Sequence, residues 1–537
     1  MGSPPGDAGA SAPGGKGILV SRRDVLAVAG LGLVAGVPRM ATAKPGGQLS
    51  WGIHTTLAPT WFDPAETSGI ITPFMVLYAL HDALVKPMPE KTMAPSLAES
   101  WSASLDGLVY EFVLRKGATF HNGEAVTAED VKFSFDRNVK IEDPNGGSSL
   151  LANMKSVEAP DPKTVIFNLK APDATWPFIL TTGSAAIVPD SYPADKLQPS
   201  DKVIGSGRYT VDSYKPGTQT VLQKNDSYTG SDPAENDQVI VQYYKTSSDL
   251  ALALKQGEVN IAYRSLSPTD INSLKGESGL QVVEGNGIEI RYLVFNEDLQ
   301  PGSNDAQKLA IRQAVAYTID RDAIASKVYE GTVQPLYSMV PQGLQYATEP
   351  FKTQYGATPD VNKANQVLQQ AGVKTPVPME VWYTPSHYGP VSADEYAEIK
   401  DELDSSGLFD VTLKSTEWNQ YSTAAFTDKY PVYQLGWFPD YPDADDYTAS
   451  FYSKDSFLND HYSNPEMEKL LAQEKASTNT SERQQAFAKI QDIGAKDAPT
   501  VPVWQGKQIA AAQDDIHGIE ETFDPSFIFR YWLITKG

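Results

Sequence analysis

The chain has 537 residues, more than one hydrophobic core usually organises, so two or three domains or lobes are expected. Its content of 41% hydrophobic and 21% charged residues is typical of a soluble globular protein. A formal net charge of -23 argues against nucleic acid as a partner and disfavours docking on anionic lipid. This charge could attract a cationic ligand, although solubility is its simpler interpretation.

The sequence contains no cysteine. Disulfides, a lipid-modified cysteine anchor, a thiol nucleophile and thiolate metal ligands are therefore all excluded within this chain.

The first 43 residues have the pattern of an export signal. Arg22-Arg23 precede an apolar run from Ala27 to Val37, and Ala41-Thr42-Ala43 suit cleavage by signal peptidase. The apolar run is shorter than the roughly 20 residues that span a bilayer. We therefore predict a twin-arginine signal and a periplasmic or extracytoplasmic location; an uncleaved anchor or a chance Arg-Arg pair is the alternative.

The first half of the chain is predicted to alternate short strands with turns. Tyr110–Leu114 and Thr164–Leu169 alternate apolar and polar residues, as half-buried strands do. Gln238–Tyr244 and Ile288–Phe295 are β-branched and aromatic, which also predicts strands. Turns rich in Gly, Pro and Asp, such as residues 142–147, separate these segments.

The second half is predicted to be α/β. Apolar residues recur at helical spacing from Leu309 to Ile319. Predicted strands Met379–Tyr383 and Val411–Leu413 flank a helix, Glu395–Leu403, and this βαβ order implies a parallel strand pair. Two further helices are predicted, one capped by Asn464 with Pro465 at its first position and one that opens at Ser481 and runs to about Lys496.

No enzyme signature is present in the sequence. The histidines form no metal-binding pair, and they are His54, His81, His121, His387, His461 and His517. Residues 276–279 miss the nucleophile-elbow pattern, and Gly205-Ser206-Gly207 has too few glycines for a phosphate cradle. The carboxylates are too numerous for a glycosidase pair to be selected. We therefore predict a protein that is not an enzyme and has no catalytic residues, no cofactor and no metal.

The stretch from Ala94 to Ser134 has the most specific pattern in the chain. It reads A-P-S-L-A-E-S-W-S-A-S-L-D-G-L-V-Y-E-F-V-L-R-K-G-A-T-F-H-N-G-E-A-V-T-A-E-D-V-K-F-S. The pattern predicts a helix-to-strand turn at Asp106-Gly107, a strand, a turn at Asn122-Gly123 and a helix N-capped by Thr127. This stretch resembles the signature region of the extracellular solute-binding proteins of peptide-type ABC importers, solute-binding family 5, the oligopeptide, dipeptide and nickel binding family.

Further matches follow in the order of that family. They are Gly205–Tyr209 (with Arg208 in place of a proline), Asn225–Gly230 (with Thr229 in place of a tryptophan), Lys255–Ile261 (with Asn260 in place of aspartate), Phe295-Asn296, Ile311–Arg321, Gly436–Tyr447 and Ala498–Val503. The resemblance covers nearly all of residues 45–537.

The resemblance implies an α/β, bilobed fold of the periplasmic-binding-protein type II kind, with an extra subdomain in lobe one. The expected division is 1–43 signal peptide and N-terminus, 44–285 lobe one with a subdomain at about 83–200, 286–505 lobe two, and 506–537 C-terminal strands that return to lobe one. By position in the fold of that family, the resemblance implies hinge crossings at residues 288–296 and near Gln505. Closure about such a hinge is a common response to ligand.

The resemblance also implies a ligand site between the lobes. In peptide-binding members the aspartate of the G-W-x-x-D-Y stretch pairs with the ligand amine, which assigns that role to Asp440 and a wall of the site to Trp437. The alternative is that Asp440, with the acidic residues Asp443, Asp445 and Asp446, only forms a turn. Five aromatic residues could line the pocket or serve only in packing, and they are Tyr441, Tyr383, Tyr388, Trp418 and Trp61. Arg208 could meet a ligand carboxylate, but a solvated turn arginine is favoured.

We therefore expect an exported, monomeric solute receptor that delivers a peptide-like, amine-bearing ligand to an ABC permease and ATPase complex. A non-peptide ligand on the same fold (an opine, an oligosaccharide or a metal chelate) is the first alternative. An exported hydrolase and a sensory or chaperone-like binding protein are the others.

Overall fold

The computed structural model describes residues 47–53, 62–66, 71–89, 91–144, 146–264, 266–389, 391–524, 526 and 528–537. The predicted export signal, residues 1–43, and the predicted site residue Trp61 lie outside the described residues.

An 11-stranded sheet runs through the described part of the molecule in the order β15-β14-β16-β12-β17-β11-β1-β10-β9-β8, with β13 paired to β17. Its strands are β1 (Gln48–Ile53), β8 (Tyr209–Lys215), β9 (Gln219–Lys224), β10 (Gln238–Tyr243), β11 (Ile261–Tyr263), β12 (Leu280–Phe295), β13 (Val333–Pro335), β14 (Val377–Tyr383), β15 (Phe409–Ser415), β16 (Val432–Trp437) and β17 (Thr500–Gln513).

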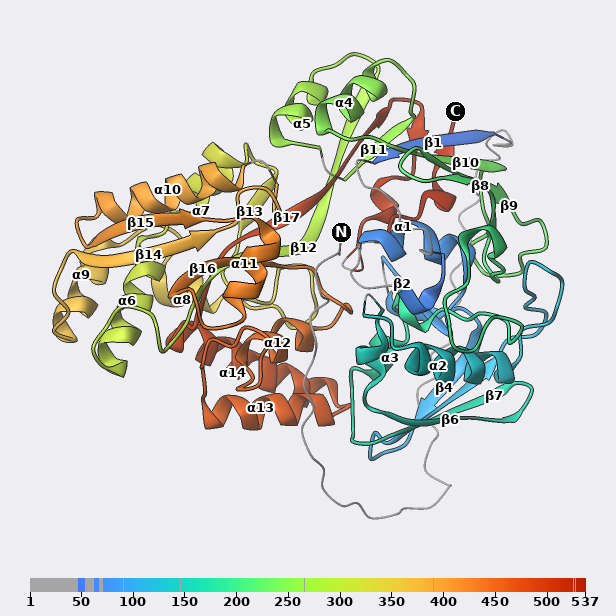
Figure 1. The fold of residues 1–537 in the computed structure, drawn as a ribbon, viewed down its shortest axis with the longest axis horizontal. Coiled ribbons are helices and arrows are strands. Elements are labelled where there is room, and N and C mark those ends of the chain that lie inside the picture. The colour runs from blue at the N-terminus through green and yellow to red at the C-terminus, as the bar shows by residue number, and fades with distance from the viewer. Residues whose placement is uncertain are drawn as a thin grey trace.

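Two long strands, β12 and β17, connect the two sides of this sheet (Figure 1). They pair antiparallel from Leu280↔Gln513 to Val294↔Thr500, and the register breaks between Asn286 and Ile290. We call β11-β1-β10-β9-β8 the first half-sheet and β16-β14-β15 the second half-sheet. The first half-sheet pairs through β11 with residues 510–512 of β17. The second half-sheet pairs through β16 with residues 290–295 of β12, on the other side of the connecting pair.

The predicted βαβ unit is confirmed. β14 and β15 pair in parallel, and α10 (Ser392–Ser405) links them. The predicted helices are confirmed as α6 (Asp305–Thr318), α13 (Pro465–Ala476) with Asn464 as N-cap, and α14 (Thr480–Asp497). The last helix begins one residue before Ser481 because Asn479 accepts from the first N–H groups of the helix.

A separate four-stranded sheet, β4-β5-β7-β6, follows the first strand of the chain. With its neighbours it forms what we call the small-sheet unit, residues 84–187, whose elements are β2 (Val85–Met88), β3 (Lys91–Pro95), β4 (Ala98–Ala103), β5 (Val109–Leu114), α2 (Ala128–Ile141), β6 (Met154–Asp161), β7 (Thr164–Leu169) and α3 (Trp176–Ile179). Thr127 caps α2 in a reciprocal capping box with Asp130, which confirms that predicted helix start.

The predicted helix before Asp106-Gly107 is wrong. Residues 98–103 form β4, which pairs antiparallel with β5. A tight turn, in which the Gly107 N–H donates to the Ser104 carbonyl at 2.9 Å, brings the two strands together. The ladder of hydrogen bonds to β5 therefore outweighs the local preference of this segment.

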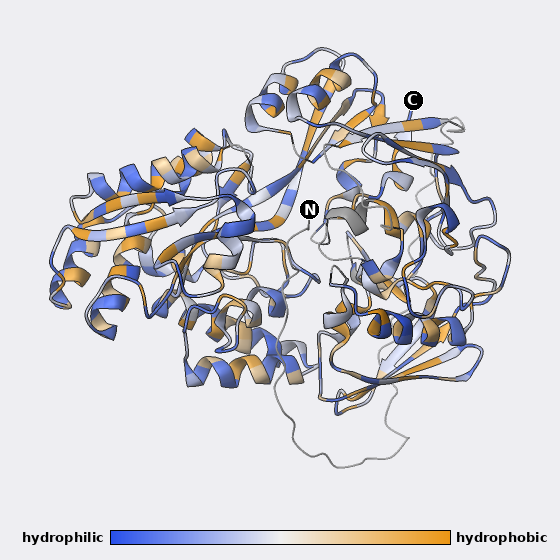
Figure 2. Cartoon of the chain, viewed as in Figure 1, coloured by the Kyte–Doolittle hydropathy of each residue, from blue (hydrophilic) through white to orange (hydrophobic). Residues whose placement is uncertain are grey.

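Helices cover the sheets on several sides. The remaining α-helices are α1 (Ile71–Leu80), α4 (Ser247–Lys255), α5 (Pro268–Lys275), α7 (Arg321–Ala323), α8 (Pro350–Tyr355), α9 (Val361–Gln370), α11 (Trp418–Ala425) and α12 (Ala449–Tyr452). The remaining strands are β18 (Ile516–His517) and β19 (Thr535–Lys536). Figure 2 shows hydrophobic and hydrophilic residues alternating along the covering helices, with hydrophobic stretches in the strands beneath them. No described helix combines the length and the apolar composition that crossing a bilayer requires.

Candidate functional site

The carboxyl end of β11, in the first half-sheet, faces the carboxyl end of β16, in the second half-sheet. β11 ends at Tyr263, opposite Ala510 of β17, whereas β16 ends at the level of Gln505. The two strands run in opposite senses, so only residues 506–509 of β17 separate their ends along the strand direction. Ligands of open α/β sheets bind outside the carboxyl ends of strands. We call this meeting place the junction: residues 286–289, residues 506–509, and the segments that follow β11 and β16.

Arg264 and Phe438 meet at the junction. Arg264 is the first residue after β11, and Phe438 is the first residue after β16. The guanidinium carbon of Arg264 lies 4.8 Å from the centre of the Phe438 ring. A cation–π contact therefore joins the ends of the two half-sheets.

Asp440 and Asp446 lie close together just beyond Phe438. The backbone N–H of Asp440 donates to Oδ2 of Asp446 at 2.8 Å, and the indole N–H of Trp437 donates to the same oxygen at 3.1 Å. Burial raises the pKa of Asp446 well above its usual range, and the nearby charge of Asp440 raises it further. A cation beside Asp440 would favour the ionised forms of both groups.

Trp437 packs in the hydrophobic core and also lies beside the Asp440–Asp446 pair. Its ring centroid lies 5.3 Å from that of Phe451 and 5.0 Å from that of Phe457, inside the main hydrophobic core. The side chain thus fixes the position of Asp446 while one face of its ring supports the core.

Tyr441 joins the second half of the molecule to the small-sheet unit. It is buried in the hydrophobic cluster of that unit, and its hydroxyl donates to Oδ2 of Asp445 at 2.6 Å. A backbone hydrogen bond of 2.7 Å from Ala174 to the Lys475 carbonyl links the same two regions. The two sides of the molecule therefore touch here as well as through the connecting strands.

Tyr388 and Trp418 come together at the carboxyl edge of the second half-sheet. The helix α10 leads from β14 to β15, and α11 leads from β15 to β16 on the other side of β14, so the loops diverge at this edge. The ring centroids of Tyr388 and Trp418 lie 5.6 Å apart. Tyr383, by contrast, stacks on Tyr396 of α10 at 5.2 Å.

Sequence reasoning missed His387 and Arg291 at this edge. The His387 ring stacks on Trp418 at 3.7 Å, and the Arg291 guanidinium lies 4.1 Å from the centre of the Tyr388 ring. The sequence does contain one signal for Arg291, which is a charged residue within the largely apolar stretch 288–295. Gly436 makes room for it, because a Cβ at that position would lie 2.3 Å from Nη1 of Arg291.

Buried charges surround Arg291. Its guanidinium pairs with Glu289 and lies 4.9 Å from the Trp504 ring centre. Glu395 of α10 accepts from the Tyr329 hydroxyl at 2.8 Å and from the Trp504 indole at 3.1 Å. Burial raises the pKa of Glu395 to about 7, although these donors and Arg291 oppose the shift.

The expectation that Arg208 is a solvated turn arginine is wrong. Its exposed fraction is 2%, and its Nη2 pairs with Oδ2 of Asp232 at 2.9 Å while Nη1 donates to the Tyr78 carbonyl at 2.6 Å. The 205–209 turn packs on α1, where the Gly207 N–H donates to the Leu80 carbonyl. This packing turns Arg208 inward, where acceptors satisfy it.

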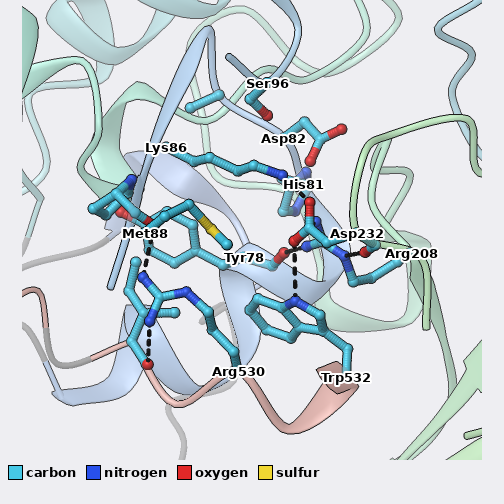
Figure 3. Close-up of a pocket in the computed structure, with 13 residues that line it drawn as sticks. Tyr78, His81, Asp82, Lys86, Met88, Ser96, Arg208, Asp232, Arg530 and Trp532 are labelled. Atoms are coloured by element: carbon cyan, nitrogen blue, oxygen red, sulfur yellow. Dashed lines mark hydrogen bonds and ion pairs between the residues drawn. The ribbon is translucent and has the colours of Figure 1, made fainter. Parts of the chain in front are cut away.

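A small cavity lies beside Arg208 (Figure 3). Its lining includes Lys86, which also pairs with Asp232, and Arg530, which pairs with Asp524. Lys86, Arg208 and Arg530 already have ion-pair partners, so the charges around this cavity form a structural network. None of the residues of the junction lines the cavity. In the part of the chain that the structure describes, no group of three or more His, Asp or Glu side chains is placed to hold a metal ion.

Comparisons with known proteins agree on one family. Residues 92–459 match the model of the bacterial extracellular solute-binding proteins, family 5 (middle region). A di/tripeptide-binding protein 1 of Pseudomonas aeruginosa is 26% identical over 76% of this chain and 80% of its own length. The dipeptide-binding protein of Escherichia coli is 24% identical over 79% and 83%.

Solved structures share the fold. The ABC transporter substrate-binding protein CtaP of Listeria monocytogenes has a TM-score of 0.80 at 24% identity, covering 92% of this chain and 100% of that one. The binding protein AgaA of A. tumefaciens R10, in complex with agropinic acid, has a TM-score of 0.72 at 24% identity, covering 91% and 99%. These likenesses confirm the predicted α/β periplasmic-binding-protein fold.

Proposed function

The chain belongs to the bacterial extracellular solute-binding proteins of family 5, and we propose that it is the receptor of an ABC importer for a peptide or peptide-like, amine-bearing solute. Its relatives from Pseudomonas and Escherichia carry the names of dipeptide- or tripeptide-binding proteins, which supports the peptide class. The agropinic acid bound to AgaA makes an opine the principal alternative.

The observation that carries the proposal is the carboxyl pair Asp440–Asp446 at the junction. Burial and then the nearby charge of Asp440 raise the pKa of Asp446, so Asp440 is the group that presents its charge to a ligand ammonium. Such a pairing is favourable where water is excluded and the geometry is good. Asp446 and Trp437 are buried, so they give the pairing of Asp440 with an ammonium a rigid, poorly hydrated support.

We further propose that the molecule divides into lobe one, residues 44–285 with the returning segment 506–537, and lobe two, residues 286–505. The register break of β12 near Asn286–Ile290, opposite Gly506, is a natural place for bending, because ladder hydrogen bonds are interrupted there. Ligand would enter between the lobes, and closure would present the loaded receptor to the permease and ATPase. The receptor would act as an exported monomer and would break no covalent bond.

Thermal-shift and calorimetric titrations test the proposal. The probes are alanyl-alanine, its N-acetyl derivative, an opine, an oligosaccharide and a nickel chelate. A ligand that binds the folded state stabilises it by RT ln(1 + [L]/Kd) and so raises the unfolding temperature. We expect alanyl-alanine to stabilise the protein. We expect its N-acetyl derivative, which lacks the amine, not to stabilise it.

Asp440→Asn should weaken alanyl-alanine binding at least about tenfold, since a charge-assisted hydrogen bond at a poorly hydrated site is worth roughly 1.5–3 kcal/mol. Asp410→Asn on the exposed face of β15 is the matched control, because it removes one negative charge away from the junction. Equal affinity of the wild type and Asp440→Asn would overturn the amine assignment. Stabilisation by the oligosaccharide or the chelate alone would overturn the peptide class.

A further inference from the structure

Glu330 connects the two sides of the molecule at a place away from the junction. Its carboxylate accepts from the Thr269 hydroxyl at 3.1 Å and from the Asn272 side-chain amide at 2.7 Å. Thr269 and Asn272 belong to α5 of lobe one, whereas Glu330 follows the helical segment 324–328 of lobe two. The first turns of a helix also favour a negative charge. We call Glu330, Thr269 and Asn272 the clasp.

Each half of the clasp is fixed to its own lobe. On the α5 half, Leu274 is buried in a hydrophobic cluster with residues of α4. On the other half, the buried ring of Tyr329, directly before Glu330, lies 4.7 Å from the ring of Trp504. A change in the angle between the lobes must therefore change the distances within the clasp.

Glu330 has an unfavourable backbone for its residue type. Its φ of +51° lies in the left-handed region, which residues with a Cβ avoid. It ends a helical segment, where glycine is the usual residue in this conformation. Glycine would fit this backbone better, so the contribution of Glu330 is its side chain. Strained residues of this kind occur at switches and ligand clamps, where the surrounding structure maintains them.

The clasp spans the interrupted part of the ladder between β12 and β17. The turn that carries Glu330 is joined to β17, because the Lys507 N–H donates to the Thr332 carbonyl at 3.3 Å and β13 pairs with residues 504–506. α5 leads through a short turn into β12. Bending at residues 286–290 would therefore move the donors of α5 relative to Glu330.

Contacts between the lobes lie on both sides of the connecting strands. Figure 1 shows α5 above these strands, and α13 and the small-sheet unit below them. The hydrogen bond from Ala174 to Lys475 joins the lobes on the lower side, and the clasp joins them on the upper side. A rotation about the strands that parts the lower contact would push α5 against the turn of Glu330. The two contacts therefore favour the same, closed arrangement.

We infer that Glu330 determines ligand affinity from outside the binding site, because its clasp on α5 holds the two lobes near the closed arrangement. This inference rests on the proposed function, in which ligand binds between lobes that close. Affinity rises with the fraction of the receptor that already has the binding-competent arrangement. Loss of the clasp thus weakens binding without removing any contact to the ligand.

The first experiment is small-angle scattering of the ligand-free protein. We expect Glu330→Ala to have a larger radius of gyration than the wild type. Asp410→Ala, which removes one exposed negative charge on β15 of the same lobe, should scatter like the wild type. Equal scattering of the wild type and Glu330→Ala would overturn the inference.

The second experiment is calorimetric titration with alanyl-alanine. Glu330→Ala should bind about three- to tenfold more weakly than the wild type, as expected for the loss of exposed hydrogen bonds to a carboxylate. Equal or tighter binding would overturn the inference. Binding to neither protein would overturn the peptide class alone, because the scattering experiment tests the clasp without a ligand.

A double-mutant cycle tests whether Glu330 acts through α5. Thr269→Val with Asn272→Ala removes both donors and should weaken binding about as much as Glu330→Ala does. All three changes together should weaken it no further, because residues that act through one contact are not additive. Additive losses would overturn the clasp.

Glu330→Gly separates ligand binding from stability. Glycine adopts the left-handed conformation without strain. We expect an unfolding temperature no lower than that of the wild type, together with weaker binding of alanyl-alanine. A lower unfolding temperature with unchanged binding would assign Glu330 to folding alone and overturn the inference.

Discussion

Gly287 of β12 lies directly against Gly506 of β17, so closely that a Cβ on Gly287 would stand 2.6 Å from the Gly506 carbonyl oxygen. The contact sits at the register break between the pairs Asn286↔Lys507 and Ile290↔Gln505. The strands that join the two sides of the molecule therefore approach closely where their ladder is interrupted.

Gly287→Ala should destabilise the protein by roughly 1–3 kcal/mol, because backbone must move to admit the methyl group. Gly506→Ala is the matched control: its Cβ would meet its nearest atom, Cβ of Glu289, at an ordinary 3.6 Å. We expect the control to change the free energy of unfolding by no more than about 0.5 kcal/mol. Urea denaturation of both variants measures the difference, and equal losses would contradict this account of the contact.

Glu395 should make the stability depend on pH. Burial raises its pKa in the folded protein from 4.5 to about 7, so the folded state holds a proton that the unfolded state releases. This contribution is present in full below about pH 4.5 and is lost as the pH rises through 7. Its size is on the order of 3 kcal/mol.

Glu395→Gln should therefore flatten the fall in stability between pH 5 and pH 8, as measured by urea denaturation at several pH values. Asp460 and Glu66, whose pKa values burial also raises to about 7, continue to contribute, so the informative quantity is the difference between the wild type and the variant. Glu398→Gln, on the same helix beside the exposed Lys327, is the control. Parallel curves for the wild type and Glu395→Gln would refute the assignment.

The burial of Arg208 predicts a large cost for removing its charge. Arg208→Met leaves Asp232 with Lys86 as its remaining cation and removes the donors to Tyr78 and Tyr228. Breaking a buried pair typically costs about 3–5 kcal/mol, whereas an exposed pair on a helix contributes no more than about 0.5 kcal/mol. The exposed pair Lys132–Asp136 supplies the comparison through Lys132→Met. Similar unfolding midpoints for the two variants would rule out a structural role for Arg208.

Local patterns predicted local structure well. The alternation in β5 and β7, the capping of α2 by Thr127 and the βαβ unit around α10 all depend on residues close together in the sequence. The placement of Arg208 depends on Tyr78 and on Asp232, which are distant in the chain, and periodicity contains no information on them.

The same limit applies to the candidate site. The sequence pointed to Asp440, Tyr388 and Trp418, which follow predicted strands or lie in a matched motif. Arg264 was missed because its importance depends on two non-local facts: β11 pairs with β17 about 250 residues later, and β16 ends facing it. The left-handed backbone of Glu330 is likewise invisible in composition.

Tyr441 should help to hold the two sides of the molecule together. It extends from the loop after β16 into the cluster of the small-sheet unit, beside the hydrogen bond from Ala174 to Lys475. Tyr441→Ala should favour a more open molecule, seen as a larger radius of gyration in small-angle scattering, and should weaken ligand binding because more of the binding energy is spent on closure. Tyr441→Phe keeps the ring and loses only the hydrogen bond to Asp445, so it should stay as compact as the wild type at a cost of about 1 kcal/mol. If Tyr441→Ala scatters like the wild type and binds equally well, the contact plays no part in closure, and the connecting strands and the clasp set the relative position of the two sides.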